Sequence, residues 1–317
     1  MSFMDNKTKS IILIVLGALI VVNTIIGITL SVIHISKGKL AKAGMPALIG
    51  NVGIIDVNGI IVSDTEDFLS DYTSASKVAE DIRTFADTPT IKAIRINVSS
   101  PGGTVSGAET IVSAIEYAKN KGKKVVVYMK ELAASGGYYI SAPADYIIAS
   151  YGTLTGSIGV IVQSMNIKEL LDKVGIKTYV FKSGTHKDIL SPYREPSEDE
   201  KKMIQSIVEE YYNRFIEVIL KHRSDKISKN ELLKIADGRI LSENQALKAK
   251  LIDDIGDEQK LEEILKKLIG DEIINYVRIP KKRNLMKEIL GTIVPFKSIG
   301  AFKNPTENYL GVYYIMN

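Results

Sequence analysis

One serine of this chain, Ser135, lies among small residues in the run Ala133–Gly137. A second turn of small residues, Ser100-Pro101-Gly102-Gly103, follows the apolar stretch Ile91–Val98. A serine hydroxyl can be the nucleophile of acyl transfer, and backbone N–H groups with little side chain around them can hold the oxyanion that develops. The two segments together indicate acyl-transfer chemistry, with Ser135 as the nucleophile and the N–H groups of Gly102 and Gly136 as a two-donor oxyanion hole.

Each segment also has a plain structural interpretation. Ser135 could simply cap a helix, and Pro101-Gly102 is a turn signal in its own right. Gly136 and Gly137 nevertheless favour the close approach of a ligand to the backbone. A helix that starts after Ser135 would also place this serine at the positive end of the helix dipole, where an oxyanion is stabilised.

The base that would activate the serine is not decided by the residues. Of the three histidines, His34 borders an apolar segment and His222 ends a long amphipathic pattern, so His186 is the one rival to its neighbour Lys187. If this segment is extended, the two side chains point to opposite faces and only one can serve Ser135. The residues favour neither.

A lysine base has a condition of its own. Its pKa must fall from about 10.4 towards neutrality, which burial in an apolar crevice can achieve. Ser157, in the run Thr155–Gly159, is a hydroxyl that could orient the amine.

Strands and helices alternate around these residues. Alternation of this kind predicts a mostly parallel α/β sheet, whose functional sites gather at the carboxyl ends of the strands. Both glycine turns fall at such ends. The expected strands are Val52–Val57, Gly59–Val62, Ile91–Val98, Lys124–Met129 and Asp145–Ala149, and the expected helices are Lys77–Ala86, Val105–Lys119 and a short one from Ser135 to Ser141.

The second half of the chain is more helical. Capping-box patterns at Ser197, Ser228 and Ser242 predict three helix starts, the first of a long helix to about Lys221. Further expected elements are a strand at Val174–Phe181, another at Ile252–Ile255 and a helix at Glu258–Leu268. The charge-free end, Tyr309–Asn317, could pack as an edge strand or be a flexible, substrate-like tail.

The N-terminal region carries an apolar run, Ile11–Ile33, without an ionisable side chain. At about 1.5 Å per residue it is long enough to cross a hydrocarbon core of roughly 30 Å. It exceeds the apolar region of about 7–15 residues of a cleaved signal peptide, although Ala41-Lys42-Ala43 resembles a cleavage site. A retained anchor is favoured over a cleaved signal or a buried core helix.

These observations predict five segments. They are a tail (1–10), an anchor (11–33), a linker (34–50), a catalytic domain (51–270) and a C-terminal extension (271–317) that could bind the groove.

Composition excludes several classes of function. The 41 basic and 37 acidic residues are mixed along the chain, which argues against a nucleic-acid partner. The absence of cysteine excludes thiolate metal sites and cysteine nucleophiles.

The lysines on either side of the apolar run bear on the orientation of the anchor. Lys7 and Lys9 precede it, and Lys37, Lys39 and Lys42 follow it, so a count of basic residues favours the second flank as cytoplasmic.

The motifs together resemble the signal peptide peptidase A family, in its short bacterial form, with a Clp-protease/crotonase-like fold. The similarity extends over about Val52–Gly270, and the spacing of 52 residues from Ser135 to Lys187 fits single-domain members. The matching stretches are Asn97–Gly107, Glu131–Asp145, Gly152–Val160, Phe181–Pro192 and Ala236–Gly256.

This resemblance implies a serine peptidase that degrades signal-peptide remnants and other unfolded apolar peptides. Ser135 matches the nucleophile, Lys187 the general base and Ser157 the serine that orients the lysine, while Gly102 and Gly136 match the oxyanion hole. No metal or other cofactor is implied.

The resemblance also implies repeated β-β-α units and a ring of copies, an octamer, in which serine and lysine meet between neighbours. It implies a single-pass protein of the bacterial cell membrane with its catalytic domain outside the cytoplasm, and we follow this over the lysine count. An acyl-CoA-type enzyme and a non-enzymatic membrane scaffold of the same fold remain as alternatives.

Overall fold

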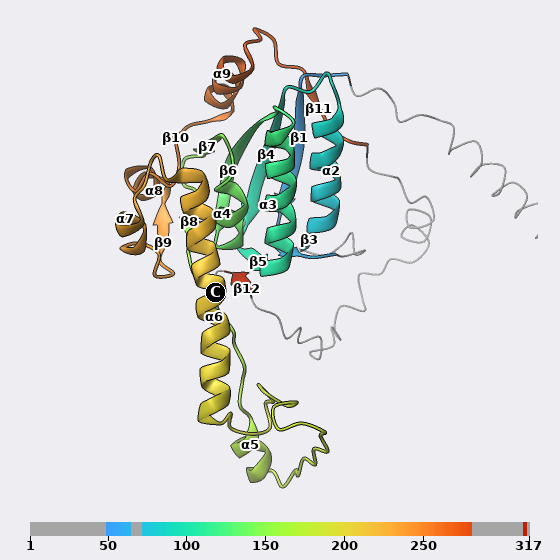
Figure 1. Ribbon diagram of the computed structural model, residues 1–317, viewed down its shortest axis with the longest axis vertical. Coiled ribbons are helices and arrows are strands. Elements are labelled where there is room, and N and C mark those ends of the chain that lie inside the picture. The colour runs from blue at the N-terminus through green and yellow to red at the C-terminus, as the bar shows by residue number, and fades with distance from the viewer. Residues whose placement is uncertain (1–48, 65–71, 281–312, 316–317) are drawn as a thin grey trace, which may run out of the picture. The chain divides into compact units, whose positions relative to one another are not determined.

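The computed structural model describes residues 49–64, 72–280 and 313–315 of the chain (Figure 1). The chain divides into two compact units, 1–48 and 49–317, and only the second contains described residues. The predicted anchor at 11–33 therefore lies outside the described residues. Within the described ranges, no helix is both long and apolar enough to cross a membrane.

A central sheet of eight strands organises the unit of residues 49–317. The strands are β1 (Val52–Asn58), β4 (Ala93–Ser100), β6 (Lys124–Ala134), β7 (Tyr146–Ala149), β8 (Leu154–Gly156), β9 (Ile240–Ser242), β10 (Asp254–Ile255) and β11 (Tyr276–Val277). Their order is β10-β7-β6-β4-β1-β11, with β8 paired to the C-terminal end of β6 and β9 paired to β8. Every pair is parallel except β8–β9, so the prediction of a mixed α/β fold with a mostly parallel sheet is confirmed.

A smaller sheet lies at the carboxyl ends of β1 and β4. It is formed by β2 (Ile60–Val62), β3 (Tyr72–Ser74), β5 (Gly102–Thr104) and β12 (Tyr313–Ile315). Strand β2 pairs in parallel with β3 and β5, and β12 pairs antiparallel with β5. For residues 313–315 the structure thus shows the edge strand that was one of the two alternatives.

The described part of the chain contains eight helices, several of which cover the two faces of the central sheet. They are α2 (Ala75–Asp87), α3 (Val105–Asn120), α4 (Gly136–Ser141), α5 (Lys168–Lys173), α6 (Glu198–Arg223), α7 (Lys229–Leu233), α8 (Glu243–Lys248) and α9 (Glu258–Ile269). A Cβ atom on Gly53 of β1 would collide with Phe85 of α2, whereas the adjacent Val52 packs with Leu261 of α9. Because successive strand residues point to opposite faces, α2 and α9 lie on opposite sides of the sheet.

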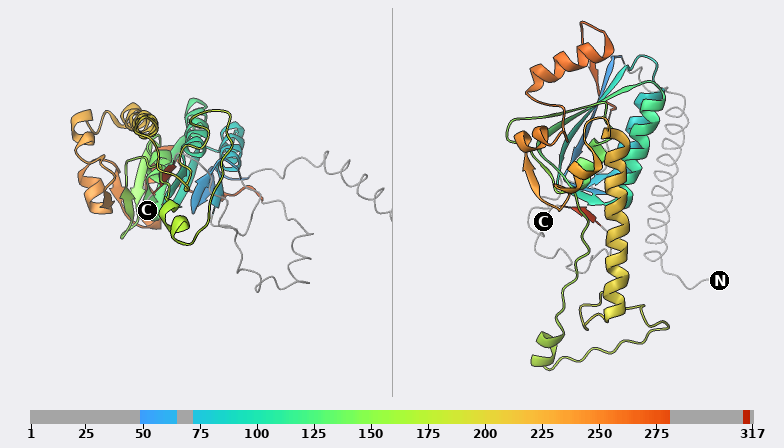
Figure 2. Two further views of the ribbon diagram at one scale, coloured as in Figure 1. Left: turned by 90° about the horizontal axis from the view of Figure 1, so that it is seen from below. Right: turned by 60° about the vertical axis from the view of Figure 1, so that its left-hand side comes forward.

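One part of the chain extends away from this body. We call residues 162–197, which include α5, the arm; none of them is buried. The arm runs beside the N-terminal half of α6, well away from the sheet (Figures 1 and 2). Helix α6 has 26 residues, and its buried apolar side chains begin only at Phe215, in its C-terminal half.

The predicted strand at Val174–Phe181 is wrong. This segment follows α5 without regular structure, and its larger apolar side chains are exposed, with Phe181 at 96%. A strand needs a neighbouring strand to take up its N–H and C=O groups, and among the described residues no strand pairs with this segment.

Candidate active site

Ser135 occupies a strained turn between β6 and α4. Its backbone has φ 52° and ψ −116°, a conformation that a residue with a side chain rarely adopts. The residue is 0% exposed. Among the described residues, its Oγ is the one buried side-chain nitrogen or oxygen that has no hydrogen-bond partner. Backbone strain and an unsatisfied buried group both cluster at functional sites, because surrounding structure must compensate for their cost.

The two glycine turns meet at this point. A Cβ atom on Gly137 would lie 2.7 Å from the carbonyl oxygen of Ser100, and one on Gly103 would lie 1.9 Å from that of Ile61. These glycines therefore allow the chain to pack closely against itself. For Gly137 this corrects the interpretation that the missing side chain makes room for a ligand, since the Ser100 backbone already takes that space.

The two predicted oxyanion donors, the N–H groups of Gly102 and Gly136, differ in whether they already donate a hydrogen bond. Gly136 is the first residue of α4, where N–H groups have no acceptor within the helix. Gly102 has φ +112°, which favours glycine, and its N–H donates to Ser100 Oγ at 3.1 Å. To hold an oxyanion, the Gly102 N–H must therefore leave Ser100. Both assignments stay predictions.

Ser157 lies beside Ser135. Strands β6 and β8 are parallel with Ala134 opposite Gly156, and the Ser135 N–H donates to the Gly156 carbonyl at 2.8 Å. Ser157 follows directly, has φ 50° and is 8% exposed. The structure thus brings the predicted nucleophile and the predicted orienting hydroxyl to adjacent strand ends, both with left-handed backbone.

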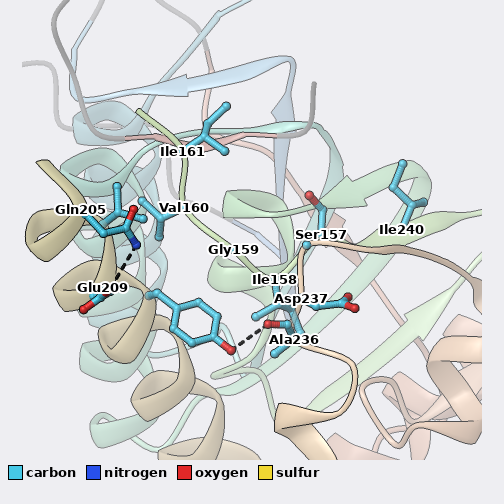
Figure 3. A pocket seen from close by; sticks show the side chains of 13 residues that line it. Ser157, Ile158, Gly159, Val160, Ile161, Gln205, Glu209, Ala236, Asp237 and Ile240 are labelled. Carbon is cyan, nitrogen blue, oxygen red and sulfur yellow. Dashed lines mark hydrogen bonds between the residues drawn. The ribbon is translucent and has the colours of Figure 1, made fainter. Parts of the chain in front are cut away.

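A pocket of about 510 Å³ opens next to Ser157 (Figure 3). Its walls come from the segment after β8, from α6 and from the loop before β9, and the Tyr212 hydroxyl donates across it to the Ala236 carbonyl at 2.7 Å. The lining residues are Ser157, Ile158, Gly159, Val160, Ile161, Gln205, Val208, Glu209, Tyr212, Ala236, Asp237, Gly238 and Ile240. A volume of this size can take a peptide side chain or a segment of another chain.

The structure does not bring Lys187 to Ser135 within one chain. Lys187 lies on the arm and is exposed, whereas Ser135 Oγ is buried and unpartnered. Residues 184–191 form successive turns, with the Lys187 N–H donating to the Gly184 carbonyl and the Ile189 N–H to the His186 carbonyl, so the segment is not extended. In these turns the side chains of His186 and Lys187 are not fixed to opposite faces as they would be in a strand. His186 Nδ1 lies 3.2 Å from Glu200 Oε1.

A polar network that the sequence did not reveal holds α4 in place. The Tyr139 hydroxyl donates to Glu109 of α3, Arg214 of α6 donates to Glu109 at 2.7 Å, and the Tyr139 N–H donates to the Ser135 carbonyl at 2.8 Å. Burial raises the pKa of Glu109, but the hydrogen bonds from Arg214 and Tyr139, together with the charge of Arg214, outweigh it and keep the pKa below its usual value. Three helices are thereby tied together one turn after Ser135, through residues too far apart in sequence to give a local signal.

The similarity to known proteins covers the part of the chain that contains these site residues. The profile described as "Peptidase family S49" matches residues 117–270, which include Ser135, Ser157 and Lys187. A protein of Enterococcus faecium named "Putative signal peptide peptidase SppA" is 38% identical over 229 residues, 70% of this chain and 65% of that protein.

Two further relatives carry the name "Putative protease". The one from Methanocaldococcus jannaschii is 40% identical over 190 residues, 59% of this chain and 60% of that protein. The one from Synechocystis sp. is 36% identical over 205 residues, 65% of this chain and 69% of that protein. The chain spans less than two thirds of the length of the first two relatives.

Proposed function

Because the chain belongs to peptidase family S49, a family of serine peptidases, we propose that it cleaves unfolded apolar peptides, signal-peptide remnants among them. Ser135 is the nucleophile and Lys187 the general base. The observation that carries this proposal is the Ser135 hydroxyl, which is buried, unpartnered and held in strained backbone where two glycine turns meet.

The reaction is acyl transfer in two steps. Neutral Lys187 takes the Ser135 proton as Oγ attacks the peptide carbonyl, and the amide breaks when Lys187 returns that proton to the leaving amine. Water then hydrolyses the acyl-serine. The N–H groups of Gly102 and Gly136 hold the oxyanion in both steps, and Ser157 orients the amine. No step requires a metal or a nucleotide.

The base comes from a neighbouring copy in this proposal. Lys187 lies on an arm that exposes several large apolar side chains, among them Leu170, Ile176, Tyr179 and Phe181. Exposed apolar surface of this kind is typical of protein–protein contacts. A ring of copies with a Clp-protease/crotonase-like fold, an octamer by family resemblance, would bring each arm to the next Ser135. The anchor at 11–33 would hold this ring on the outer face of the bacterial cell membrane.

Substrate binding by strand addition is supported by the chain's own C-terminal segment. Residues 313–315 pair antiparallel with β5, and Ile315 stands opposite Gly102. An extended peptide could use the same edge, which would place its carbonyls beside the predicted oxyanion donor. We therefore propose that the tail competes with substrate for β5.

The test is peptide hydrolysis with a series of fluorogenic apolar peptides. We expect Ser135→Ala and Lys187→Ala each to lower turnover by at least about 100-fold with the fold intact, and His186→Ala to lower it by less than about tenfold. Near-normal turnover of Lys187→Ala, with loss in His186→Ala, would assign the base to histidine. If Ser135→Ala kept full activity, Ser135 would not be the nucleophile, and an acyl-CoA-type enzyme or a non-enzymatic scaffold would be the better hypothesis.

A further inference from the structure

Both neighbours of Lys187 in the chain are tied to a single carboxylate. Glu200 lies in the first turn of α6, and its side chain is 2% exposed. His186 Nδ1 lies 3.2 Å from Glu200 Oε1. Asp188 is joined to the same group through Arg194. Lys187 therefore stands between two points that are held by Glu200.

Arg194 is the link, and it binds two carboxylates with one planar group. Towards Glu200, its Nη1 and Nη2 donate at 2.7 Å each. Towards Asp188, Nε donates at 3.0 Å and Nη2 at 2.7 Å. A guanidinium that makes two-pronged contacts on both sides fixes angles as well as distances, which an ammonium cannot do. We call Asp188, Arg194 and Glu200 the clamp.

The clamp has a firm attachment to α6. The Ser197 N–H donates to Glu200 Oε2 at 2.9 Å, and the Glu200 N–H donates to Ser197 Oγ at 3.2 Å, so the carboxylate is part of the capping box. Arg194 holds the pKa of Glu200 and of Asp188 well below the usual range, with Lys182 adding to the effect at Asp188. Both carboxylates consequently stay ionised wherever a lysine base could work.

Outside the clamp, the segment that carries Lys187 is held by hydrogen bonds from Lys182 to Asp188 at 2.6 Å and to the Thr185 carbonyl at 2.8 Å, and from Ser164 Oγ to the Leu190 carbonyl at 2.8 Å. Residues 183–190 form turns, none of them is buried, and no strand ladder or helix includes them. A general base must reach hydrogen-bond distance of the proton that it removes. A displacement of 1 Å in such a group can cost about 100-fold in rate.

We propose that Asp188, Arg194 and Glu200 are positioning residues for the lysine base. The clamp mounts the turn that carries Lys187 on the rigid end of α6, so that the amine reaches the Ser135 of a neighbouring copy in one orientation. This inference rests on the proposed function, because it gives the clamp a role only if Lys187 is the base.

The test compares three variants in the full-length protein. Arg194→Lys keeps the charge but loses the planar fork, and Glu200→Gln keeps the shape but loses the charge. Glu198→Gln is the matched control, since it makes the same change two residues away in a side chain that is 79% exposed and paired with Lys201. With a fluorogenic apolar peptide, we expect both clamp variants to lower kcat by about 10- to 100-fold with KM changed by less than about twofold. The control should match the wild type.

Chemical rescue gives a second readout. In Arg194→Ala, added guanidinium below denaturing concentration should restore part of kcat, whereas ammonium at equal ionic strength should not, because only the planar ion can bridge the two carboxylates. All variants should remain folded and keep the oligomer size of the wild type, although Arg194→Ala should lower the thermal midpoint because it leaves the buried Glu200 carboxylate without its guanidinium.

The outcomes separate the two proposals. Wild-type kcat in Arg194→Lys and Glu200→Gln, together with an inactive Lys187→Ala, would overturn the positioning role and leave the proposed function standing. An active Lys187→Ala would overturn the proposed function itself. Loss of kcat that accompanies loss of the oligomer or of the folded state would also overturn the positioning role, since the clamp would then be structural.

Discussion

Replacement of Ser135 by alanine should make the protein more stable while it abolishes activity. The hydroxyl is fully buried and has no hydrogen-bond partner among the described residues. An unsatisfied buried hydroxyl costs about 1–3 kcal/mol, and Ser135→Ala removes that cost. Alanine keeps the Cβ atom, so the strain of φ 52° remains in the variant and does not contribute to the change. We expect the free energy of unfolding to rise by about 1–3 kcal/mol.

Ser141→Ala is the matched control and should have the opposite effect. Ser141 is the last residue of α4, the helix that Ser135 precedes; it is also 0% exposed, and its hydroxyl donates to the Gly137 carbonyl at 2.7 Å. Removal of a satisfied hydrogen bond of this kind costs about 0.5–1.5 kcal/mol. The two serines are equally buried, and the side-chain hydroxyl has a hydrogen-bond partner only at Ser141.

Urea unfolding followed by circular dichroism measures both changes, and a thermal scan provides a check. For a domain of about 150–250 residues, each kcal/mol shifts Tm by about 2–4 °C, so Ser135→Ala should melt above the wild type and Ser141→Ala below it. If Ser135→Ala is no more stable than the wild type, or falls with Ser141→Ala, the hydroxyl is satisfied in solution. The buried serine would then carry no energetic cost that its chemistry has to justify.

Three further predictions concern the surroundings of the site. Gly137→Ala should lower stability by about 1–3 kcal/mol and slow peptide turnover, because its Cβ would lie 2.7 Å from the Ser100 carbonyl oxygen; unchanged melting and turnover would contradict the close packing of the two turns. Burial raises the pKa of Asp253, but the hydrogen bonds from Arg223, Lys226 and the Ile147 N–H, together with the charge of Arg223, outweigh it and lower the pKa below 3.8, so the stability from these contacts is full above that pH and is lost as pH falls through the folded-state pKa. Urea titrations should therefore show a weaker loss of stability below about pH 4 in Asp253→Asn than in the wild type, and parallel curves would refute this. Deletion of residues 309–317 should lower the apparent KM for apolar peptides by freeing β5; unchanged kinetics, with an unclipped tail by mass spectrometry, would remove the tail as a competitor.

Much of the fold was predictable because its signals are local. The capping boxes at Ser197, Ser228 and Ser242 each mark a helix start, and all three form the reciprocal hydrogen bonds that the pattern predicts. The same holds for the turn at Ser135, where an apolar strand and small residues predicted a strand–turn–helix unit. The alternation of strands with helices along the chain is likewise a local signal, and it predicted the parallel sheet.

The errors have a different physical origin. Val174–Phe181 has the apolar, β-branched composition of a strand, but strand formation depends on a pairing partner, and this information is not local. The turns around Lys187 are likewise held by Arg194 and Glu200, several residues further along the chain. The tie from Arg214 to Glu109 spans 105 residues and has no periodic signature. Contacts of this kind follow from the assembled fold.

Subunit mixing tests the central claim most directly, namely that Ser135 of one copy works with Lys187 of the next. Ser135→Ala and Lys187→Ala proteins, each inactive alone, are combined under conditions that allow exchange of copies, and peptide hydrolysis is measured. With random mixing in a ring, about a quarter of the sites pair an intact serine with an intact lysine, so activity should return to about a quarter of the wild-type rate. A mixture that forms verified hetero-oligomers yet stays inactive would contradict the account.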